Sequence, residues 1–385
     1  MRAATRRALV TIAGLATVGA GLAAPLSVGA PTVLSVGAAS SHGPGSSSGT
    51  ATSAARGSGV YQVGLFGDMP YGDYGRSQFP AVLADMNRAD LAFSVFDGDI
   101  KNGSEPCYAD VDGSAAAAGK PDVYKQALRA FNSLRAPVVV TPGDNEWTDC
   151  DRTKIKPAFD SSERLAYERS VFYPTNQTLG QRTATVTRQS ARYPENVRGT
   201  VGPVTFMALN IPGSDNNWVD PARDGTSEGP AAEAQAEYKA RNAANLAWLE
   251  AGFAEAEKAH SKAVMIVIQA DMWDPEAAAS NTLVHYADTK NALARLSIRF
   301  GKPVALVNGD SHSFEITKPL TDAATVDAAG GKGPNVIENF TRVTTFGSAQ
   351  NHWVSVTVDP ADPNVFSFHQ HLVAKNLPTY TPPKR

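Results

Sequence analysis

Histidine and cysteine are scarce in this chain, whose 385 residues include 7 histidines and 2 cysteines. The net charge is only −3 at pH 7, and no stretch of the sequence is strongly basic. Proteins that bind nucleic acid as their main ligand neutralise phosphates with clustered Lys and Arg, so that class is not expected here. No Gly-x-Ser-x-Gly elbow directly follows a predicted strand, and the P-loop and dinucleotide fingerprints are absent. Serine hydrolases and nucleotide-binding folds are therefore disfavoured.

The N-terminal segment differs in charge from the rest of the chain. It has no acidic residue before Asp68, and arginines within the first seven residues precede an apolar run from Ala8 to about Ala24. A short basic segment followed by an apolar core is typical of a secretory signal peptide. Because the run is rich in Gly and Ala and contains little Leu or Ile, it would make a poor permanent span. We expect a secreted protein with no stable membrane span once the signal is removed.

The composition divides the chain into three parts. Residues 1–39 are interpreted as the signal peptide and leader, and residues 40–58 as a flexible linker rich in Gly and Ser, because such segments bury too little apolar surface to fold. Residues 59–385 are predicted to form a single domain. In an exported protein the two cysteines, Cys107 and Cys150, are candidates for one disulfide, and two unpaired cysteines are the alternative.

Apolar strands alternate with helical patterns from residue 59 onward. Such alternation predicts βαβ units and a buried sheet. The predicted strands are 61–66, 91–96, 137–140, 183–187, 201–209, 264–268, 304–307, 343–347, 352–358 and 365–371. The predicted helices are 79–86, 123–134, 231–259 and 293–300. A single mixed α/β domain with two sheets accounts best for this pattern.

Acidic or amide-bearing loops follow five of the buried strands. They are Gly67-Asp68, Gly98-Asp99, Gly143-Asp144-Asn145-Glu146, Gln269-Ala270-Asp271 and Gly309-Asp310-Ser311-His312. Ligands bind just beyond the carboxyl ends of parallel strands, and glycine before the acidic residue permits a sharp exit turn. One Gly-Asp alone indicates only a turn, but several carboxylates in one crevice repel each other unless a cation neutralises them. The ordered series therefore predicts a site for divalent metal ions.

This series resembles the motifs of the calcineurin-like metallophosphoesterases. Those proteins carry, in chain order, an Asp-x-His, a Gly-Asp, a Gly-Asn-His-Glu/Asp, a later His after a strand and a Gly-His-x-His, and the similarity here spans about residues 60–315. The resemblance implies a four-layer αββα sandwich with two mixed β-sheets. It also implies hydrolysis of phosphate esters by a metal-activated water.

The first, second and fifth motifs align without ambiguity. Asp68 matches the first aspartate, although Pro70 stands where the family has histidine, and Asp99 matches the aspartate that bridges two metals in the family. In the fifth motif Asp310 replaces the first histidine, and His312 is retained.

The third and fourth motifs leave alternatives open. Without a gap, Asp144 replaces the family asparagine and Asn145 the histidine; with a shift of one residue, Asn145 is the ligand and Glu146 stands in the histidine position. Gln269 or Asp271 occupies the fourth position. The loop from Asn210 to Trp218 also follows a predicted strand, and it is either a polar turn or a segment that faces the crevice.

The resemblance implies a set of site residues, in which oxygen ligands replace several histidines. The implied metal ligands are Asp68, Asp99, Asn145, Gln269, Asp271, Asp310 and His312. The implied catalytic residues are Asp144, Glu146 and His312. Carboxylate and amide oxygens suit Mg, Mn or Ca better than Fe or Zn, which remain possible, and the site would hold one or two ions.

The sequence thus suggests a secreted metal-dependent phosphoesterase that acts on a small-molecule phosphate ester. Two alternatives remain. The replaced histidines suggest a non-catalytic binding protein on the same fold, and a further alternative is an exported domain whose carboxylate site binds Ca for stability. The sequence predicts neither the identity of the substrate nor the oligomeric state.

Overall fold

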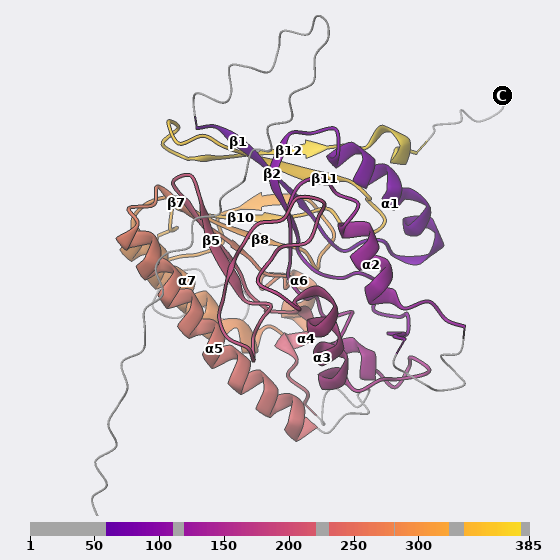
Figure 1. Ribbon diagram of the computed structural model, residues 1–385. Helices are drawn as coiled ribbons and strands as arrows, with labels where there is room; N and C mark the ends of the chain where they lie inside the picture. Colours follow the sequence, from indigo (N-terminus) through magenta and orange to yellow (C-terminus); the bar gives the residue numbers. More distant parts are fainter. Residues whose placement is uncertain (1–58, 111–118, 221–230, 281, 323–334, 379–385) are drawn as a thin grey trace, which may run out of the picture. The chain divides into compact units, whose positions relative to one another are not determined.

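The computed structural model describes residues 59–110, 119–220, 231–280, 282–322 and 335–378, all within one unit of the chain, Thr32–Arg385 (Figure 1). The predicted signal peptide and leader, 1–39, and the predicted linker, 40–58, lie outside the described residues. Within the ranges that are described, no helix has the length and apolar character needed to cross a membrane.

The first sheet has five strands in the order β12-β11-β1-β2-β3. Its strands are β1 (Tyr61–Phe66), β2 (Leu91–Phe96), β3 (Val138–Val140), β11 (Trp353–Val358) and β12 (Phe366–His371). The strands β1, β2 and β3 run parallel, and β11 and β12 complete the sheet in antiparallel pairing. Phe66 pairs with Phe96, which pairs with Val140, so the three parallel strands end side by side.

The second sheet has seven strands in the order β4-β5-β6-β7-β8-β10-β9. Its strands are β4 (Thr187–Arg188), β5 (Val197–Val201), β6 (Val204–Ala208), β7 (Ala263–Val267), β8 (Val304–Asn308), β9 (Glu315–Thr317) and β10 (Phe340–Thr344). The strands β6, β7, β8 and β10 are parallel, and the edge strands pair antiparallel.

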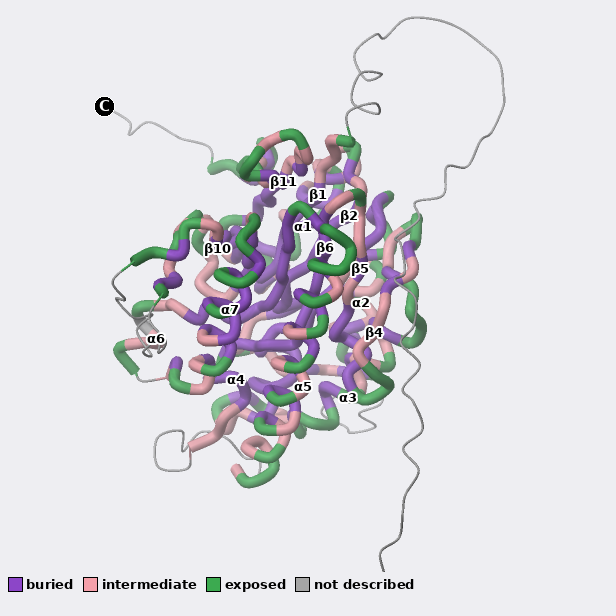
Figure 2. The backbone as a smooth tube through the Cα atoms, turned by 90° about the vertical axis from the view of Figure 1, so that its left-hand side faces the viewer, coloured by how far each residue is buried: buried purple, intermediate pink, exposed green. Residues whose placement is uncertain are grey.

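Apolar side chains hold the two sheets face to face. Phe93 of β2 meets Phe206 of β6 edge to face, with ring centroids 4.7 Å apart, and both belong to a core cluster that draws valines from both sheets. The central strands are buried along most of their length (Figure 2), whereas the edge strands β4, β9 and β12 are not. Each such side chain contributes about 1.5–3 kcal/mol when it leaves water, so this shared core fixes the mutual position of the two sheets.

Helices cover the outer face of each sheet (Figure 1). The helices α1 (Gly72–Met86), α2 (Val123–Phe131) and α3 (Ser161–Phe172) share a core cluster with β1 to β3. The helices α5 (Ala231–Lys258) and α7 (Ala287–Phe300) share another with β7 and β8. Shorter helical segments are η2 (Thr148–Asp151), α4 (Gly213–Asn216), α6 (Pro275–Ala279), η3 (Val284–Tyr286) and η4 (Ala374–Asn376). The predicted four-layer αββα sandwich with two mixed sheets is confirmed.

The predicted elements agree best at the parallel strands. The strands predicted at 61–66 and 91–96 are confirmed at both ends. The strand predicted at 201–209 is confirmed as β6, but it begins later than predicted, because Val201 ends β5 and the chain turns at Gly202 with a φ of 54°. Of the strand predicted at 183–187, only Thr187 lies in β4. The helix α3 was not predicted.

Cys107 and Cys150 form the predicted disulfide. The bond joins the loop after β2 to the 3₁₀ helix η2 across a sequence separation of 43 residues. It therefore ties together two of the loops that follow parallel strands.

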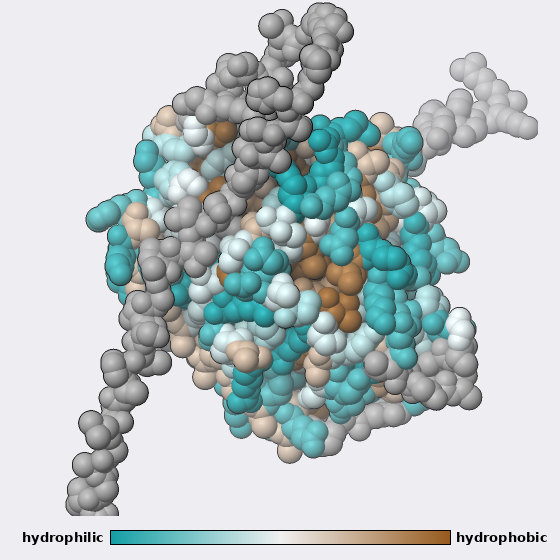
Figure 3. All heavy atoms as spheres, in the orientation of Figure 1, coloured by the Kyte–Doolittle hydropathy of each residue, from teal (hydrophilic) through white to brown (hydrophobic). Residues whose placement is uncertain are grey.

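Hydrophilic side chains cover much of the face shown in Figure 3, and hydrophobic ones gather in a patch near its middle.

Candidate metal centre

The loops after the parallel strands of both sheets meet at one edge of the sandwich. Asp68, Asp99 and Asp144 follow β1, β2 and β3, and Asp310 follows β8. The backbone N–H of Asp310 donates to both carboxylate oxygens of Asp68, at 3.2 and 3.1 Å, so the two sheets are joined at this point. Asp68, Asp99 and Asp144 are buried, and Asp310 is partly buried. The structure thus brings together carboxylates that are up to 242 residues apart in the sequence.

The site residues have an unusual backbone. Asp68, Asp99, Asp310 and His312 all have positive φ values, of 49°, 68°, 72° and 61°. A residue other than glycine in the left-handed region costs roughly 1–3 kcal/mol and persists only where its surroundings fix it. Here the backbone supplies such fixing bonds, because the N–H of Asp68 donates to the carbonyl of Gly98 at 2.9 Å. Such strain is typical of functional sites.

Asp99 lies at the centre of a dense set of hydrogen bonds. Its Oδ2 accepts from the Tyr71 hydroxyl at 2.7 Å, from Asn145 Nδ2 at 2.7 Å and from Gln269 Nε2 at 3.3 Å. Its Oδ1 accepts from the backbone N–H of Asn145 at 3.1 Å. Burial raises the pKa of Asp99 well above its usual range, and the charge of Asp144 adds to this effect. The donors hold the carboxylate in place, whereas the neighbouring acids oppose its charge.

His312 contacts the first aspartate. Its Nε2 lies 3.3 Å from Asp68 Oδ1, and its ring meets Tyr71 edge to face with centroids 5.2 Å apart. Burial alone would lower the pKa of His312, but the hydrogen bond and the charge of Asp68 outweigh burial and raise it above the ordinary value. The side chain of His312 is about one third exposed, at 32%. The imidazole ring of His312 therefore lies at the rim of the site, where its raised pKa favours the protonated form.

Asp144 and Asp310 face the same small space beside Gly213. A Cβ atom at Gly213 would lie 2.9 Å from Asp144 Oδ2 and 2.9 Å from Asp310 Oδ1, so only glycine leaves room for both carboxylates. Burial raises the pKa of Asp310 well above its usual range, followed by the charges of Asp144 and Asp68.

Gln269 presents its amide nitrogen, not its oxygen, to the acids. Its Nε2 donates to Asp144 Oδ1 at 3.0 Å and to Asp99 Oδ2 at 3.3 Å. Its Oε1 accepts from the backbone N–H of Gly213. Because that N–H can only donate, it fixes the orientation of the amide. In this arrangement Gln269 acts as a hydrogen-bond donor between two carboxylates.

Asp271 and Glu146 lie behind the central carboxylates. Asp271 forms an ion pair with Arg342, and its Oδ2 accepts from the Ser311 hydroxyl at 2.8 Å. Glu146 is fully buried, and its Oε1 accepts from the backbone N–H of Asp99 at 3.0 Å and of Gly143 at 2.6 Å. Burial raises the pKa of Glu146 to about 7. Its contacts fix the turns that carry two of the motifs.

Three further polar residues at the site were missed by sequence reasoning. Asp97 is fully buried beside Asp68, and the Thr345 hydroxyl donates to its Oδ2 at 2.9 Å. Asp149 lies in η2, and Arg152 directly follows it. Arg152 Nη2 forms an ion pair with Asp149 Oδ2 at 2.7 Å. The doublet Asp97-Gly98-Asp99 was a visible signal for Asp97. Nothing in the sequence pattern marked the other two, because only the fold brings η2 to this edge.

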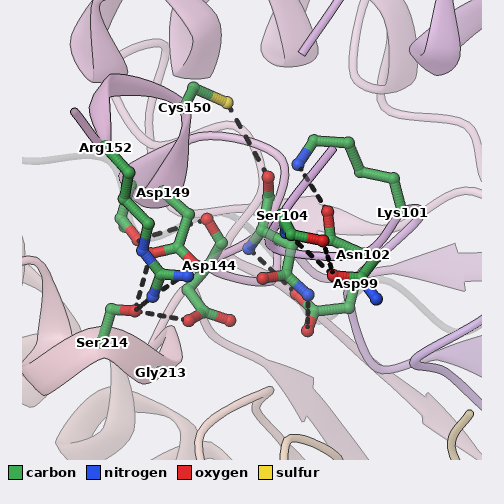
Figure 4. A network of polar contacts seen from close by, with 12 residues as sticks. Asp99, Lys101, Asn102, Ser104, Asp144, Asp149, Cys150, Arg152, Gly213 and Ser214 are labelled. Carbon is green, nitrogen blue, oxygen red and sulfur yellow. Dashed lines mark hydrogen bonds and ion pairs between the residues drawn. The ribbon is translucent and has the colours of Figure 1, made fainter. Parts of the chain in front are cut away.

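A cavity of about 410 Å³ opens over these groups. Its lining includes Asp99, Asp144, Asp149, Asp310 and His312. Part of the surrounding polar network, from Asp99 and Asp144 to Arg152 and Ser214, is drawn in Figure 4. Carboxylate oxygens of this kind suit a hard cation such as Mg, Mn or Ca. In the arrangement described they contact amide, hydroxyl and guanidinium groups, and among the described residues no group of three or more His, Cys, Asp or Glu side chains is gathered closely enough to hold an ion.

Comparisons with known proteins give only distant similarities. No family model and no curated protein matches the chain. A solved structure titled "GAP50 the anchor in the inner membrane complex of Plasmodium" is similar with a TM-score of 0.37 and 9% identity, covering 81% of this chain and 89% of that one. The phosphopantetheinyl hydrolase PptH from Mycobacterium tuberculosis is similar with a TM-score of 0.36 and 13% identity, covering 75% and 91%. Similarities this low say nothing about what this chain binds or catalyses.

Proposed function

We propose that the protein is a metal-dependent phosphoesterase that acts outside the cytoplasm. The observation that carries the proposal is the convergence of aspartates from strand ends of both sheets at one open cavity. Asp99, Asp144 and Asp310 line this cavity, and Asp68 is buried beside Asp310. Burial and mutual repulsion raise the pKa values of Asp99 and Asp310. Such a cluster of negative charge is relieved when a divalent cation binds among the carboxylates. The hydrogen-bond donors that now contact them would then share these oxygens with the ion.

The residues that would hold such an ion line the cavity or lie directly beside it. Asp99, Asp144 and Asp310 line it together with Asn145 and His312, and Asp68 is buried next to Asp310 and His312. A divalent ion at this site supplies Lewis-acid polarisation of phosphoryl oxygens and a lowered pKa for a bound water. The hydroxyl of Tyr71, which donates to Asp99, would keep that carboxylate in position.

His312 would hold a proton close to the reacting phosphoryl group. Its pKa is raised by Asp68, and its ring is partly exposed to the cavity. It can therefore donate a hydrogen bond to a phosphoryl or leaving-group oxygen. We propose a positioning role for Glu146, because its contacts are with the backbone of the motif loops and it does not line the cavity.

A second candidate is a non-catalytic binding protein. The hydrogen bonds to Asp99 and the ion pair of Asp271 with Arg342 favour it, because both neutralise acids without a cation. On this hypothesis the cavity binds a ligand that the protein does not transform. Export, which both candidates share, is supported by the disulfide and by the basic and apolar N-terminal pattern of the sequence.

The test is metal content together with turnover. Protein purified without chelator is analysed by mass spectrometry, and hydrolysis of p-nitrophenyl phosphate is measured with Mg, Mn, Ca and Zn added in turn. We expect bound or required metal, and turnover that is lost in Asp99→Asn but kept in Asp73→Asn, whose carboxylate is fully exposed shortly after the first motif. Absence of both metal and turnover would overturn the proposal in favour of the binding protein. Bound metal that raises the melting temperature without turnover would indicate a structural ion site.

A further inference from the structure

Two cavities adjoin at the site and share Asp149, Arg152 and Asp310 in their linings. The first, of about 410 Å³, lies over the carboxylates. The second, of about 250 Å³, has a different character, because aromatic and aliphatic side chains form part of its wall. These side chains are Trp218, Val219, Ala277, Leu283 and Tyr286. Asp151, Asp215 and Asp271 also line the second cavity, so both cavities are acidic and the second has an apolar wall in addition.

Arg152 lies at the junction of the two cavities. It is the one Lys or Arg among the residues that line the first cavity, and its side chain is 43% exposed. Nη2 is held by Asp149 Oδ2 at 2.7 Å and by the Ser214 hydroxyl oxygen at 3.1 Å (Figure 4). A guanidinium has five N–H donors in a planar fork, so these two contacts leave donors for a ligand.

The surroundings of Arg152 fix its position. Arg152 directly follows η2, which the disulfide between Cys107 and Cys150 ties to the loop after β2. The backbone of that loop leaves room for the guanidinium, because a Cβ atom at Gly103 would lie 3.1 Å from Arg152 Nη1. A fixed cation opposite several carboxylates is what an anionic substrate requires, since those carboxylates alone would repel a phosphate group.

Ser214 reaches the same junction from the other sheet. It begins a run of four residues with positive φ, Ser214 to Asn217, with φ values from 50° to 63°. Buried Arg241 clamps this strained turn by donating to Asn216 Oδ1 at 2.6 Å and to the Asn216 carbonyl at 2.9 Å. As a result the Ser214 hydroxyl lies 2.6 Å from Asp144 Oδ2 and 2.8 Å from Asp149 Oδ1.

We propose that Arg152, with Ser214 beside it, binds the phosphoryl oxygens of the substrate, and that the second cavity holds its organic group. The inference rests on the proposed phosphoesterase function and narrows its substrates. They are phosphate esters whose organic group carries aromatic or branched apolar surface, which the wall around Trp218 and Leu283 would bury. Arg and phosphate form bidentate, charge-assisted hydrogen bonds, whereas an apolar group gains by leaving water.

The first experiment tests Arg152. Binding of phenylphosphonate, a non-hydrolysed ester analogue, is measured by calorimetry for the wild type, Arg152→Ala and Arg152→Lys. We expect Arg152→Ala to weaken binding by about 10- to 100-fold and Arg152→Lys to restore part of it, with metal content unchanged. Arg299→Ala is the matched control, because Arg299 is 42% exposed and pairs with Glu257 at 2.9 Å. If Arg152→Ala binds within twofold of the control, the assignment of Arg152 is overturned.

The second experiment tests the organic-group cavity. The wild type should bind phenylphosphonate at least about 5-fold more tightly than methylphosphonate, because only the phenyl group reaches the apolar wall. Ala277→Phe, which fills that wall, should remove the preference while leaving methylphosphonate binding unchanged, and Ala279→Phe on the exposed side of α6 should not. Unchanged methylphosphonate binding also shows that Ala277→Phe is folded. Equal affinity of the wild type for both phosphonates would overturn this part of the inference.

The two proposals fail separately. If no ester is hydrolysed with any ion but phosphonates bind in an Arg152-dependent way, the phosphoesterase function is wrong and the subsite remains. If esters are hydrolysed but kcat and KM for p-nitrophenyl phosphate are the same in Arg152→Ala as in Arg299→Ala, the subsite is wrong and the function remains.

Discussion

Arg342 on β10 forms an ion pair with Asp271, and both side chains are buried, with exposures of 6% and 5%. The guanidinium also contacts Glu315, with Nη2 3.0 Å from Oε2. Asp271 occupies the fourth motif position, where the family resemblance implied a metal ligand. The protein therefore supplies its own positive charge to an acid that was expected to need a metal ion. Within the part of the chain that the structure describes, Asp99, Asp144 and Asp310 have no ion pair of this kind.

We predict that removing Arg342 destabilises the protein and makes Asp271 available to a cation. Breaking one partner of a buried ion pair leaves an uncompensated charge, so Arg342→Met should lower the free energy of unfolding by about 3 kcal/mol in chelator. The double variant Arg342→Met/Asp271→Asn should lose less. Urea unfolding with and without Mg or Ca measures both effects. The interpretation fails if the single variant loses less stability than the double variant. It also fails if a cation restores none of the stability that the single variant has lost.

A second prediction concerns Gln269, which donates to Asp99 and Asp144. Gln269→Glu keeps the shape of the side chain but replaces a donor with a carboxylate oxygen. In chelator this substitution should cost about 1–3 kcal/mol, because two hydrogen bonds become repulsive contacts. In the presence of a divalent cation it should raise the affinity for the ion, because one more charged oxygen faces the site.

The control for this prediction is Gln177→Glu, since Gln177 is exposed and its Nε2 donates to Thr185 Oγ1 at 2.8 Å. It should change neither stability nor ion affinity appreciably. Calorimetric titration with Mn and thermal melting in chelator provide the two measurements. An ion affinity for Gln269→Glu equal to that of the wild type would show that no cation binds between Asp99 and Asp144.

The sequence predicted the parallel strands and the loops after them because both depend on local pattern. Apolar runs such as 61–66 and 91–96 are mostly buried strands, and a Gly-Asp after each allowed the site aspartates to be found. The disulfide followed from compartment and cysteine count. The prediction is less accurate at strand ends, as at Gly202, where a turn with positive φ makes β6 begin three residues later than the apolar pattern indicates.

The same distinction holds for the site. Asp68, Asp99, Asp144 and Asp310 were found from motif order, and the structure brings them together. The donors that surround them were not foreseen, because the contacts of Gln269 with Gly213 and of Asp271 with Arg342 join segments that no motif connects. Arg152 was missed for this reason, whereas Ser214 lies in the loop from Asn210 to Trp218, which the sequence offered either as a polar turn or as a segment that faces the crevice. A family motif predicts which residues meet, but not which polar partners neutralise them.

A third prediction is that stability in chelator falls as the pH rises. Burial, followed by the charge of Asp144, raises the pKa of Asp149 from 3.8 in the unfolded chain to about 7 in the folded protein. Between these pH values the folded state binds a proton that the unfolded state has released. The free energy of unfolding therefore decreases as pH rises from about 4 to about 7, by up to about 1.4 kcal/mol per pH unit for this group.

Thermal melting at pH 4.5 to 8 in chelator measures this dependence. Asp149→Asn should flatten the curve, because its amide does not titrate. Addition of a divalent cation should also flatten it, because the cation competes with protons for the acids of the site. A wild-type melting temperature that rises steadily from pH 4.5 to 7 in chelator would contradict the prediction.

The last prediction concerns the disulfide that anchors η2. The double variant Cys107→Ser/Cys150→Ser removes a cross-link between residues 43 positions apart, which in the chain-entropy model contributes about 4 kcal/mol. We expect a lower melting temperature and a lower urea midpoint. Because η2 carries Asp149 and is followed by Arg152, phenylphosphonate binding should weaken as well. Wild-type protein treated with reductant should behave like the double variant, and reductant should have no effect on the variant itself. If the variant is destabilised but binds phenylphosphonate with unchanged affinity, the disulfide supports the fold alone, and other contacts hold Arg152 at the cavity.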